Sequence, residues 1–227
     1  METVVVSIGG SILAPEIIDP EFVMKIAKML KNASRKLKVY AVVGGGKTAR
    51  KYIDAGRAIG ADEFTLDDMG IAATRMNARL LIAALGEKAN PVPPEDVNDA
   101  AVLGKKYEIV VMGGTVPGHT TDAVAASLAE KVGAKRFINA TSIDGVYTAD
   151  PKKDKNAKKI ENLTHKDLME IVSKNGMGAG VNSVIDPVAA LILFRSKLET
   201  LVVNGYELKE LESAMLGKKF KGSVIKS

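Results

Sequence analysis

Three glycine-rich stretches of this chain carry residue types that bind phosphate groups. The longest has the sequence MGGTVPGHTTD at residues 112–122, between an apolar run typical of a buried strand and apolar residues repeating at helical spacing. Its glycines let the backbone approach a ligand closely, Pro117 stiffens the turn, and Thr120 or Thr121 can cap the next helix, whose free N–H groups attract an anion. The loop therefore has the composition of a phosphate site, which a tight turn without a ligand would share.

The second stretch, Gly44-Gly45-Gly46-Lys47, also joins an expected strand to an expected helix. Lys47 and Arg50 fall in the first turn of that helix, where the helix dipole already supplies positive charge and disfavours cations. Two cations beside three glycines therefore predict an anionic ligand, the alternative being a turn with two solvated basic side chains. The stretch lacks the GxxxxGK[ST] spacing of a Walker A loop.

The third stretch, Gly9-Gly10-Ser11, follows the first expected strand at residues 3–8. All three stretches thus begin where a strand ends. Open α/β sheets bind their ligands at this end of the strands. We therefore expect the loops to face one another across the carboxyl edge of a sheet.

Composition narrows the class of protein. The chain has 227 residues, no cysteine and two histidines, which excludes disulfides, thiolate metal sites and a histidine-built metal centre. It has no apolar run of membrane-span length and no signal-peptide pattern, so we expect a cytoplasmic protein with no membrane partner. The net charge of +5 is spread among acidic residues with few aromatics, so a phosphorylated small molecule accounts for it without nucleic acid.

The apolar patterns predict strands that alternate with helices. The expected strands span residues 3–8, 39–43, 109–112, 136–140, 200–203 and 222–225, and helices are expected to begin near residues 20, 47, 66, 95, 121, 164 and 187. This alternation is typical of the α/β class, with a largely parallel sheet covered on both faces. With no repeat and no compositional break, residues 1–227 are expected to form a single domain.

Several polar residues have two interpretations from spacing alone. Asp67 and Asp68 fall in the opening turn of the helix expected over residues 66–85, where they complement the dipole or hydrogen-bond a pair of sugar hydroxyls. Arg75 and Arg79 share a helix face, which favours solvated surface or a subunit contact over catalysis. Tyr147 lies between two turns, where packing on its neighbours is favoured over covering a nucleobase.

Four segments together carry a resemblance to a known family: SIGGS at residues 7–11, GGGK at 44–47, GGTVPGHTTD at 113–122 and IDGVYTADP at 143–151. In this order they resemble the amino acid kinase superfamily and, within it, the archaeal-type uridylate kinases. The resemblance covers essentially the whole chain. It implies a three-layer α/β/α sandwich with a largely parallel central sheet. It also implies transfer of the γ-phosphoryl group of ATP to UMP with Mg²⁺, giving UDP and ADP in pyrimidine nucleotide biosynthesis, by a homohexamer built from dimers.

The resemblance assigns acceptor binding to the N-terminal part of the chain and ATP binding to the C-terminal part, and no residue is assigned as a metal ligand. The residues it implies for UMP are Gly44, Asp67, Gly114, Thr115, Val116, Pro117, Gly118, His119 and Thr120. Those it implies for ATP are Gly10, Ser11, Gly45, Arg50, Thr141, Tyr147 and Asp150.

Three residues are expected to act in catalysis. In phosphoryl transfer, positioning and charge neutralisation supply nearly all the rate. We therefore expect Lys47 and Arg50, with Mg²⁺, to stabilise the transition state, and Asp122 to orient the cationic groups or metal-bound water. Many superfamily members carry a lysine where this chain has Ser7, so Lys47 is the expected principal cation.

Three alternative functions stay open. One is another kinase of the superfamily, such as isopentenyl phosphate kinase, aspartokinase or carbamate kinase. Isopentenyl phosphate kinase would require a histidine near the GGG loop and an apolar acceptor pocket, whereas Asp67 favours a sugar. The second is a nucleotide-binding module that has lost catalysis, which the presence of Ser7 in place of the lysine favours. The third is a nucleic-acid-binding protein, which only the net charge favours.

Overall fold

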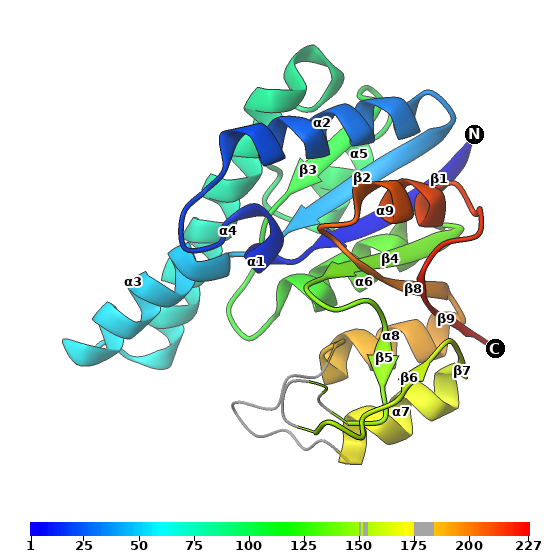
Figure 1. Ribbon diagram of the computed structural model, residues 1–227. Coiled ribbons are helices and arrows are strands. Elements are labelled where there is room, and N and C mark those ends of the chain that lie inside the picture. The colour runs from blue at the N-terminus through cyan, green and yellow to red at the C-terminus, as the bar shows by residue number, and fades with distance from the viewer. Residues whose placement is uncertain (150, 152–153, 175–183) are drawn as a thin grey trace.

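The computed structural model describes residues 1–149, 151, 154–174 and 184–227. Within them, seven strands form one sheet in the order β3-β2-β1-β4-β8-β9-β7 (Figure 1). Neighbouring strands are parallel except β8 and β9, which confirms the predicted largely parallel sheet. The strands are β1 (Glu2–Ile8), β2 (Leu37–Val43), β3 (Ile109–Met112), β4 (Arg136–Thr141), β7 (Asn162–Thr164), β8 (Glu199–Asn204) and β9 (Gly222–Lys226). A separate antiparallel pair is formed by β5 (Val146–Tyr147) and β6 (Lys159–Ile160).

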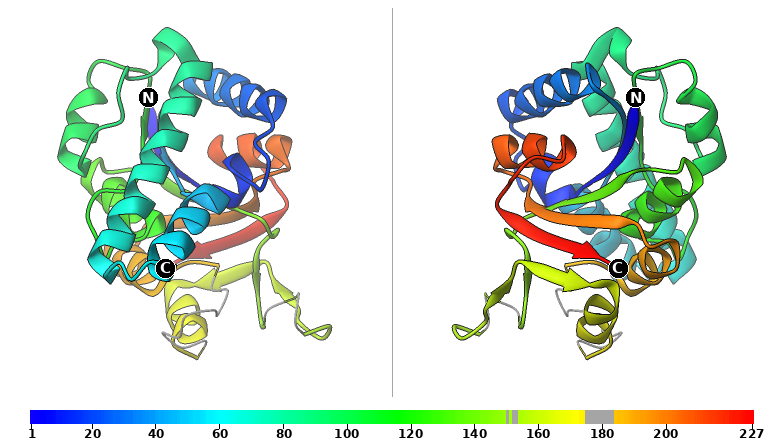
Figure 2. Two further views of the ribbon diagram at one scale, coloured as in Figure 1. Left: turned by 90° about the vertical axis from the view of Figure 1, so that its left-hand side faces the viewer. Right: turned by 90° about the vertical axis from the view of Figure 1, so that its right-hand side faces the viewer.

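Helices cover both faces of the sheet, so the chain forms three layers (Figure 2). One face packs against α1 (Gly10–Leu13), α2 (Pro20–Ser34), α4 (Glu63–Leu85) and α9 (Leu208–Met215). The other packs against α5 (Val97–Leu103), α6 (Thr121–Lys131), α7 (His165–Lys174) and α8 (Pro187–Ser196). The helix α3 (Gly46–Ala58) lies against α4, and a short 3₁₀ helix, η1 (Gly86–Lys88), follows α4. None of the helices in the described segments is both long and apolar enough to cross a membrane.

The alternation of side chains along β1 explains the two cores. Val4, Val6 and Ile8 are buried in the core beneath α2, α4 and α9, whereas Val5 is buried on the side of α6. Because successive residues of a strand point to opposite faces, Ser7 belongs to the α6 side with Val5. A polar residue is thus placed in the middle of the sheet, next to the start of α6.

The strand order reverses between β1 and β4. From β1 the chain adds β2 and then β3 on one side, and it later returns to add β4 and β8 on the other. In open α/β sheets the crevice at such a reversal, outside the carboxyl ends of the strands, is where ligands bind. The three glycine-rich loops leave the sheet from β1, β2 and β3, beside this reversal.

Capping residues mark the starts of the helices, and one predicted start is corrected. Asp19, Thr120 and Asp186 accept backbone N–H bonds at the starts of α2, α6 and α8, as their sequence positions predict. The start predicted near residue 66 is wrong by one turn, because Asp62 caps α4 by accepting the Thr65 amide at 2.8 Å. Asp67 therefore lies in the second turn of α4 and not in its opening turn.

The segment between α4 and α5 is attached to β3 through Asn90. This buried side chain accepts the Val111 N–H at 2.7 Å and donates to the Val111 carbonyl at 2.9 Å, so it completes the hydrogen bonding of one strand residue. Ala89 forms a parallel bridge with Ile109 just before it. This attachment fixes the path of the chain from α4 back to the sheet.

Candidate active site

A cleft with a volume of about 400 Å³ lies beyond the carboxyl ends of β2 and β3. That volume is within the range of sites that hold small ligands. Its walls come from the start of α3, from one side of α4 and from the loop before α6. The lining residues are Gly45, Ala49, Ile53, Asp67, Gly70, Ile71, Thr74, Gly114, Val116, Pro117, Gly118, His119, Thr120 and Thr121.

Most of the residues predicted on the acceptor side meet in this cleft. Asp67, Gly114 and residues 116–120 all line it, although Asp67 is far from the loop in sequence. Gly44 and Thr115 are absent from the lining but adjoin residues that form it. The structure therefore brings the two predicted parts of the acceptor site together.

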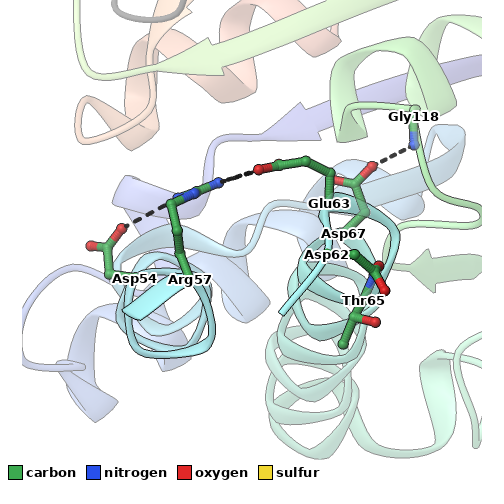
Figure 3. Close-up of polar contacts among 7 residues, drawn as sticks. All are labelled: Asp54, Arg57, Asp62, Glu63, Thr65, Asp67 and Gly118. Atoms are coloured by element: carbon green, nitrogen blue, oxygen red, sulfur yellow. Dashed lines mark hydrogen bonds and ion pairs between the residues drawn. The ribbon is translucent and has the colours of Figure 1, made fainter. Parts of the chain in front are cut away.

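Asp67 contacts the loop that faces it. Its Oδ2 atom accepts the Gly118 N–H at 2.7 Å, and Gly118 has a φ of +81°, a conformation that glycine adopts without strain (Figure 3). Arg57 near the end of α3 pairs with Glu63 at the start of α4, with 3.3 Å between Nη2 and Oε2. These contacts join the loop to α4 and α4 to α3, the three parts of the chain that form the walls of the cleft.

The other two glycine loops pack backbone against backbone. A Cβ atom on Gly10 would lie 2.6 Å from the Gly46 Cα, and one on Gly44 would lie 2.5 Å from the Gly10 nitrogen. Gly46 also has a φ of +61°, and there is no room for a side chain on it, because a Cβ atom would overlap the carbonyls of Ala14 and Gly10. Three glycines are thus required for the ends of β1 and β2 to meet.

The predicted ATP residues Gly10, Ser11, Gly45 and Thr141 gather around this contact. Gly9 donates to the Ala140 carbonyl at 2.9 Å, next to Thr141, and Gly205 donates to the Thr141 carbonyl at 2.8 Å. The Tyr206 hydroxyl donates to the Ser11 carbonyl at 2.8 Å. The ends of β1, β2, β4 and β8 therefore converge on α1.

Tyr147 packs on its neighbours, as the spacing of the turns favours. Its hydroxyl donates to Asp144 Oδ1 at 2.6 Å, and Lys159 donates to Asp144 Oδ2 at 3.1 Å. The hydrogen bond from Tyr147 and the nearby Lys159 ammonium hold the pKa of Asp144 below its usual value, and the pKa of Tyr147 is raised because its proton is shared with that carboxylate. The next predicted ATP residue, Asp150, lies outside the described residues.

Lys47 and Arg50 are exposed on the first turns of α3 and do not line the cleft. The ion pairs that α3 makes within the described residues use Lys51 with Glu16, and Arg57 with Asp54 and Glu63. The pKa of Glu16 is lowered mainly by its hydrogen bond and ion pair with Lys51 and to a smaller extent by the charge of Lys47. The catalytic roles expected for Lys47 and Arg50 stay predictions.

Asp122 lies at the start of α6, directly beside the central strand. Part of the residue is exposed, but its carboxyl group is surrounded by protein, and the Ser7 hydroxyl donates to its Oδ1 atom at 2.6 Å. Burial raises the pKa of Asp122 to about 6, opposed by the hydrogen bond from Ser7 and assisted by the negative charge of Asp186. Ser7 thus contacts the carboxylate that was expected to orient cationic groups.

Asp186 joins the start of α8 to Thr120 at the end of the loop before α6. The sequence did not predict this contact. Its Oδ1 atom caps α8 by accepting the Val188 N–H at 2.8 Å, while its Oδ2 atom accepts the hydroxyl of Thr120. The sequence indicated only the cap, from the Asp-Pro pair. The second contact joins residues 66 positions apart, for which no local pattern exists.

Thr74 and Asn77 of α4 were also missed, and the surface or subunit contact favoured for Arg75 is corrected, because Arg75 is partly buried and donates to the carbonyls of Gly114 and Thr115. Thr74, Arg75 and Asn77 make hydrogen bonds to the backbones of the two longer glycine-rich loops. Thr74 and Asn77 are buried, although they are polar and stand on a face whose neighbours, Ala73 and Ala78, are apolar. The signal available in the sequence was the presence of two polar residues three positions apart on the buried side of a helix.

The chain is similar in sequence to known proteins over most of its length. The model of the family described as amino acid kinase family matches residues 2–204. A protein of Archaeoglobus fulgidus named uridylate kinase is 51% identical over 202 residues, covering 89% of this chain and 90% of the relative. One of Methanocorpusculum labreanum with the same name is 47% identical, covering 99% of this chain and 96% of the relative.

Solved structures agree with the fold. The crystal structure of uridylate kinase from Archaeoglobus fulgidus superposes with a TM-score of 0.90 at 47% identity, covering 99% of this chain and 100% of that one. The structure of UMP kinase from Bacillus anthracis superposes with a TM-score of 0.80 at 22% identity, covering 99% of this chain and 96% of that one. The predicted three-layer α/β/α fold is confirmed.

The raised pKa of Asp122 predicts a pH dependence of stability. Because the folded state holds this proton more tightly than the unfolded state, the contribution of Asp122 to the free energy of unfolding is largest below the unfolded pKa of 3.8 and is lost as the pH rises through about 6. The full loss corresponds to about 3 kcal/mol. Asp122→Asn, which has no proton to lose, should therefore gain stability relative to the unaltered protein between pH 4 and 7. Urea unfolding across this pH range measures the difference.

Ser7→Ala provides the matched variant. Removing the hydroxyl that favours the carboxylate should raise the pKa of Asp122 further, so the loss of stability should extend to higher pH. A difference between Asp122→Asn and the unaltered protein that stays constant from pH 4 to 7 would contradict the assignment.

Proposed function

Because this chain belongs to the amino acid kinase family, we propose that it transfers the γ-phosphoryl group of ATP to UMP, giving UDP and ADP. The observation that carries the proposal is the cleft of about 400 Å³ in which Asp67 faces the loop at residues 114–120. An acidic acceptor beside an anion-binding loop suits a nucleoside monophosphate, which carries a sugar and a phosphate. The relatives named uridylate kinase support UMP as that nucleotide.

On the acceptor side, α6 and α4 have different tasks. The first N–H groups of α6 have no intrahelical partner and favour negative charge, so we assign the UMP phosphate to the helix start, which Thr120 caps. Asp67 uses Oδ2 for the Gly118 amide, and we assign its Oδ1 to the ribose hydroxyls. Gly44 and residues 114–119 complete this half.

On the donor side, the contact between the loops of Gly10 and Gly45 provides a backbone cradle for the ATP phosphates. Ser11, Arg50, Thr141, Tyr147 and Asp150 are proposed to border the rest of ATP. The cations Lys47 and Arg50 neutralise charge on the phosphoryl group during transfer, and Asp122 holds the nearby polar groups in place.

Mg²⁺ is the proposed cofactor, bound mainly through ATP. Among the described residues, no three Asp, Glu, His or Cys side chains group together as a metal site. We expect Mg²⁺ to be held by the substrate phosphates, by water and by one or two carboxylates, as is common for this ion. We assign Asp122 and Asp186, whose negative charges interact, as the carboxylates near this ion. The positive charge of Mg²⁺ would offset the negative charge of the phosphates.

The proposed product, UDP, is a precursor of CTP, so we place the reaction in pyrimidine nucleotide biosynthesis in the cytoplasm.

A coupled assay of ADP release tests the activity directly. With ATP and Mg²⁺, the protein should turn over UMP in preference to CMP, dTMP, isopentenyl phosphate, aspartate and carbamate. Turnover of another acceptor alone would overturn the acceptor assignment. Binding of ATP and UMP without UDP formation would favour a nucleotide-binding module that has lost catalysis.

Replacing the proposed principal cation tests the mechanism. Lys47→Met should lower kcat by about 100-fold or more, because it removes charge that stabilises the transition state, while UMP affinity changes by no more than a few fold. Lys51→Met, which removes a neighbouring lysine paired with Glu16, is the matched control and should retain most of kcat. Unchanged kcat in Lys47→Met would remove Lys47 from this role.

We propose a homohexamer as the working assembly. Tyr52, Ile59, Phe64 and Met76, on or between α3 and α4, are large apolar residues with exposed fractions between 59% and 82%. Figure 1 shows these two helices extending beyond the sheet, where a second chain has access to them. We assign these exposed apolar side chains to the contact between copies.

Light scattering in solution should give six times the chain mass of 24.0 kDa. Phe64→Glu should lower the measured mass, because it places a charge in the proposed contact. Met24→Glu changes an exposed apolar residue on α2 and serves as the control that keeps the mass. A monomer for the unaltered protein would contradict the hexamer.

A further inference from the structure

One side of α4 contacts the backbones of two glycine-rich loops at once. The first is the acceptor loop, residues 113–120, and the second is the turn of Gly44 and Gly45. The contacts come from Thr74, Arg75 and Asn77, within a single turn of the helix. None of the three was assigned a role in the proposed reaction.

Asn77 sets the orientation of the second loop. Its Nδ2 atom donates to the Gly44 carbonyl at 2.9 Å and to the Gly45 carbonyl at 3.1 Å, and the residue is only 2% exposed. In a trans peptide the N–H points opposite to the preceding carbonyl. With both carbonyls turned toward α4, the amides of Gly45 and Gly46 point away from it, as donors to an anion must.

Thr74 sets the position of the acceptor loop. Its hydroxyl accepts the Gly114 N–H at 2.7 Å and donates to the Ile71 carbonyl at 2.6 Å. The approach is close, because a Cβ atom on Gly113 would lie 2.6 Å from this hydroxyl. The first residues of the loop are therefore held against α4, and the Gly114 amide is occupied by protein.

Arg75 holds the carbonyl side of the same loop. Its Nε atom donates to the Gly114 carbonyl at 3.2 Å, and Nη2 donates to the carbonyls of Thr115 at 3.3 Å and Glu95 at 3.4 Å. A guanidinium offers several donors in a fixed plane, so it can tie two neighbouring peptides together. Thr74 and Arg75 thus fix the amide and the carbonyl of one residue, Gly114.

We propose that Thr74, Arg75 and Asn77 are positioning residues that set the two loops at a fixed separation before nucleotides bind. Thr74 and Arg75 act on the acceptor loop, and Asn77 acts on the turn shared by both nucleotides. They act through the backbone atoms that they bind. The identities of the two nucleotides rest on the proposed function, whereas the positioning itself rests on these hydrogen bonds.

The first experiment compares KM for UMP with KM for ATP in three variants. Thr74→Val keeps the shape of the side chain and removes the hydroxyl, and Arg75→Met removes the guanidinium. Each should raise KM for UMP by about 10-fold or more with KM for ATP within about threefold, because only the acceptor loop is released. Asn77→Leu releases the shared turn and should raise both KM values and lower kcat.

Two variants provide the controls. Thr74→Ser keeps the hydroxyl and should restore KM for UMP to within about twofold of the unaltered protein. Arg79→Met removes an exposed arginine one turn further along α4 and should change neither KM. An equal rise in both KM values for Thr74→Val, not reversed in Thr74→Ser, would overturn the proposal, because it would indicate general damage to the fold.

Hydrogen exchange gives a readout that needs no turnover. The Gly114 amide, now bound by Thr74, should exchange at least about 10-fold faster in Thr74→Val and return to the slow rate in Thr74→Ser. Unchanged exchange would overturn the positioning role. If the unaltered protein fails to phosphorylate UMP while exchange accelerates in Thr74→Val, the proposed function fails and the positioning role stands. Arg75→Met, on a partly exposed residue, tests the same loop if Thr74→Val does not fold.

Discussion

The contact between the backbones of Gly10 and Gly44–Gly46 is the constraint on which the rest of the site depends. With no side chain between them, the ends of β1 and β2 meet, and α1 and α3 begin at the same place. A Cβ atom on Gly10 or Gly44 would overlap the opposite backbone, so even alanine would separate the loops. Backbone N–H groups, which no substitution except proline removes, are thereby concentrated where the strands end.

The parts of the structure that sequence predicted are those with local signals. Six of the seven strands of the sheet, the caps at Asp19 and Thr120 and the glycine-rich loops are each defined by a few neighbouring residues, and these were found. The short strand β7, with a single buried residue, was not predicted. The parts that were missed depend on distant partners. Thr74 binds Gly114 across 40 positions and Asn77 binds Gly44 across 33, so nothing near either residue indicates its task. The predicted roles of Lys47 and Arg50 depend on ligands and are not decided by the fold.

The pair Ser7 and Asp122 shows how the middle of the sheet accommodates charge. Within this sheet the Ser7 hydroxyl donates to the Asp122 carboxylate. A hydroxyl offsets less of the cost of burying a carboxylate than a cation would, which is consistent with the raised pKa of Asp122. In the proposed reaction, we assign the positive charge to α3 and to a metal ion, both outside the sheet.

The attachment of Asn90 to β3 has a consequence for how copies of this chain associate. The strand β3 is the last in the order of the sheet, and the exposed edge of a terminal strand is a template for pairing with another chain. Asn90 and Ala89 occupy the edge at Val111 and Ile109, so the sheet cannot simply continue into a neighbour there. At this edge a neighbouring copy would therefore meet the segment of Ala89 and Asn90 and not an open strand.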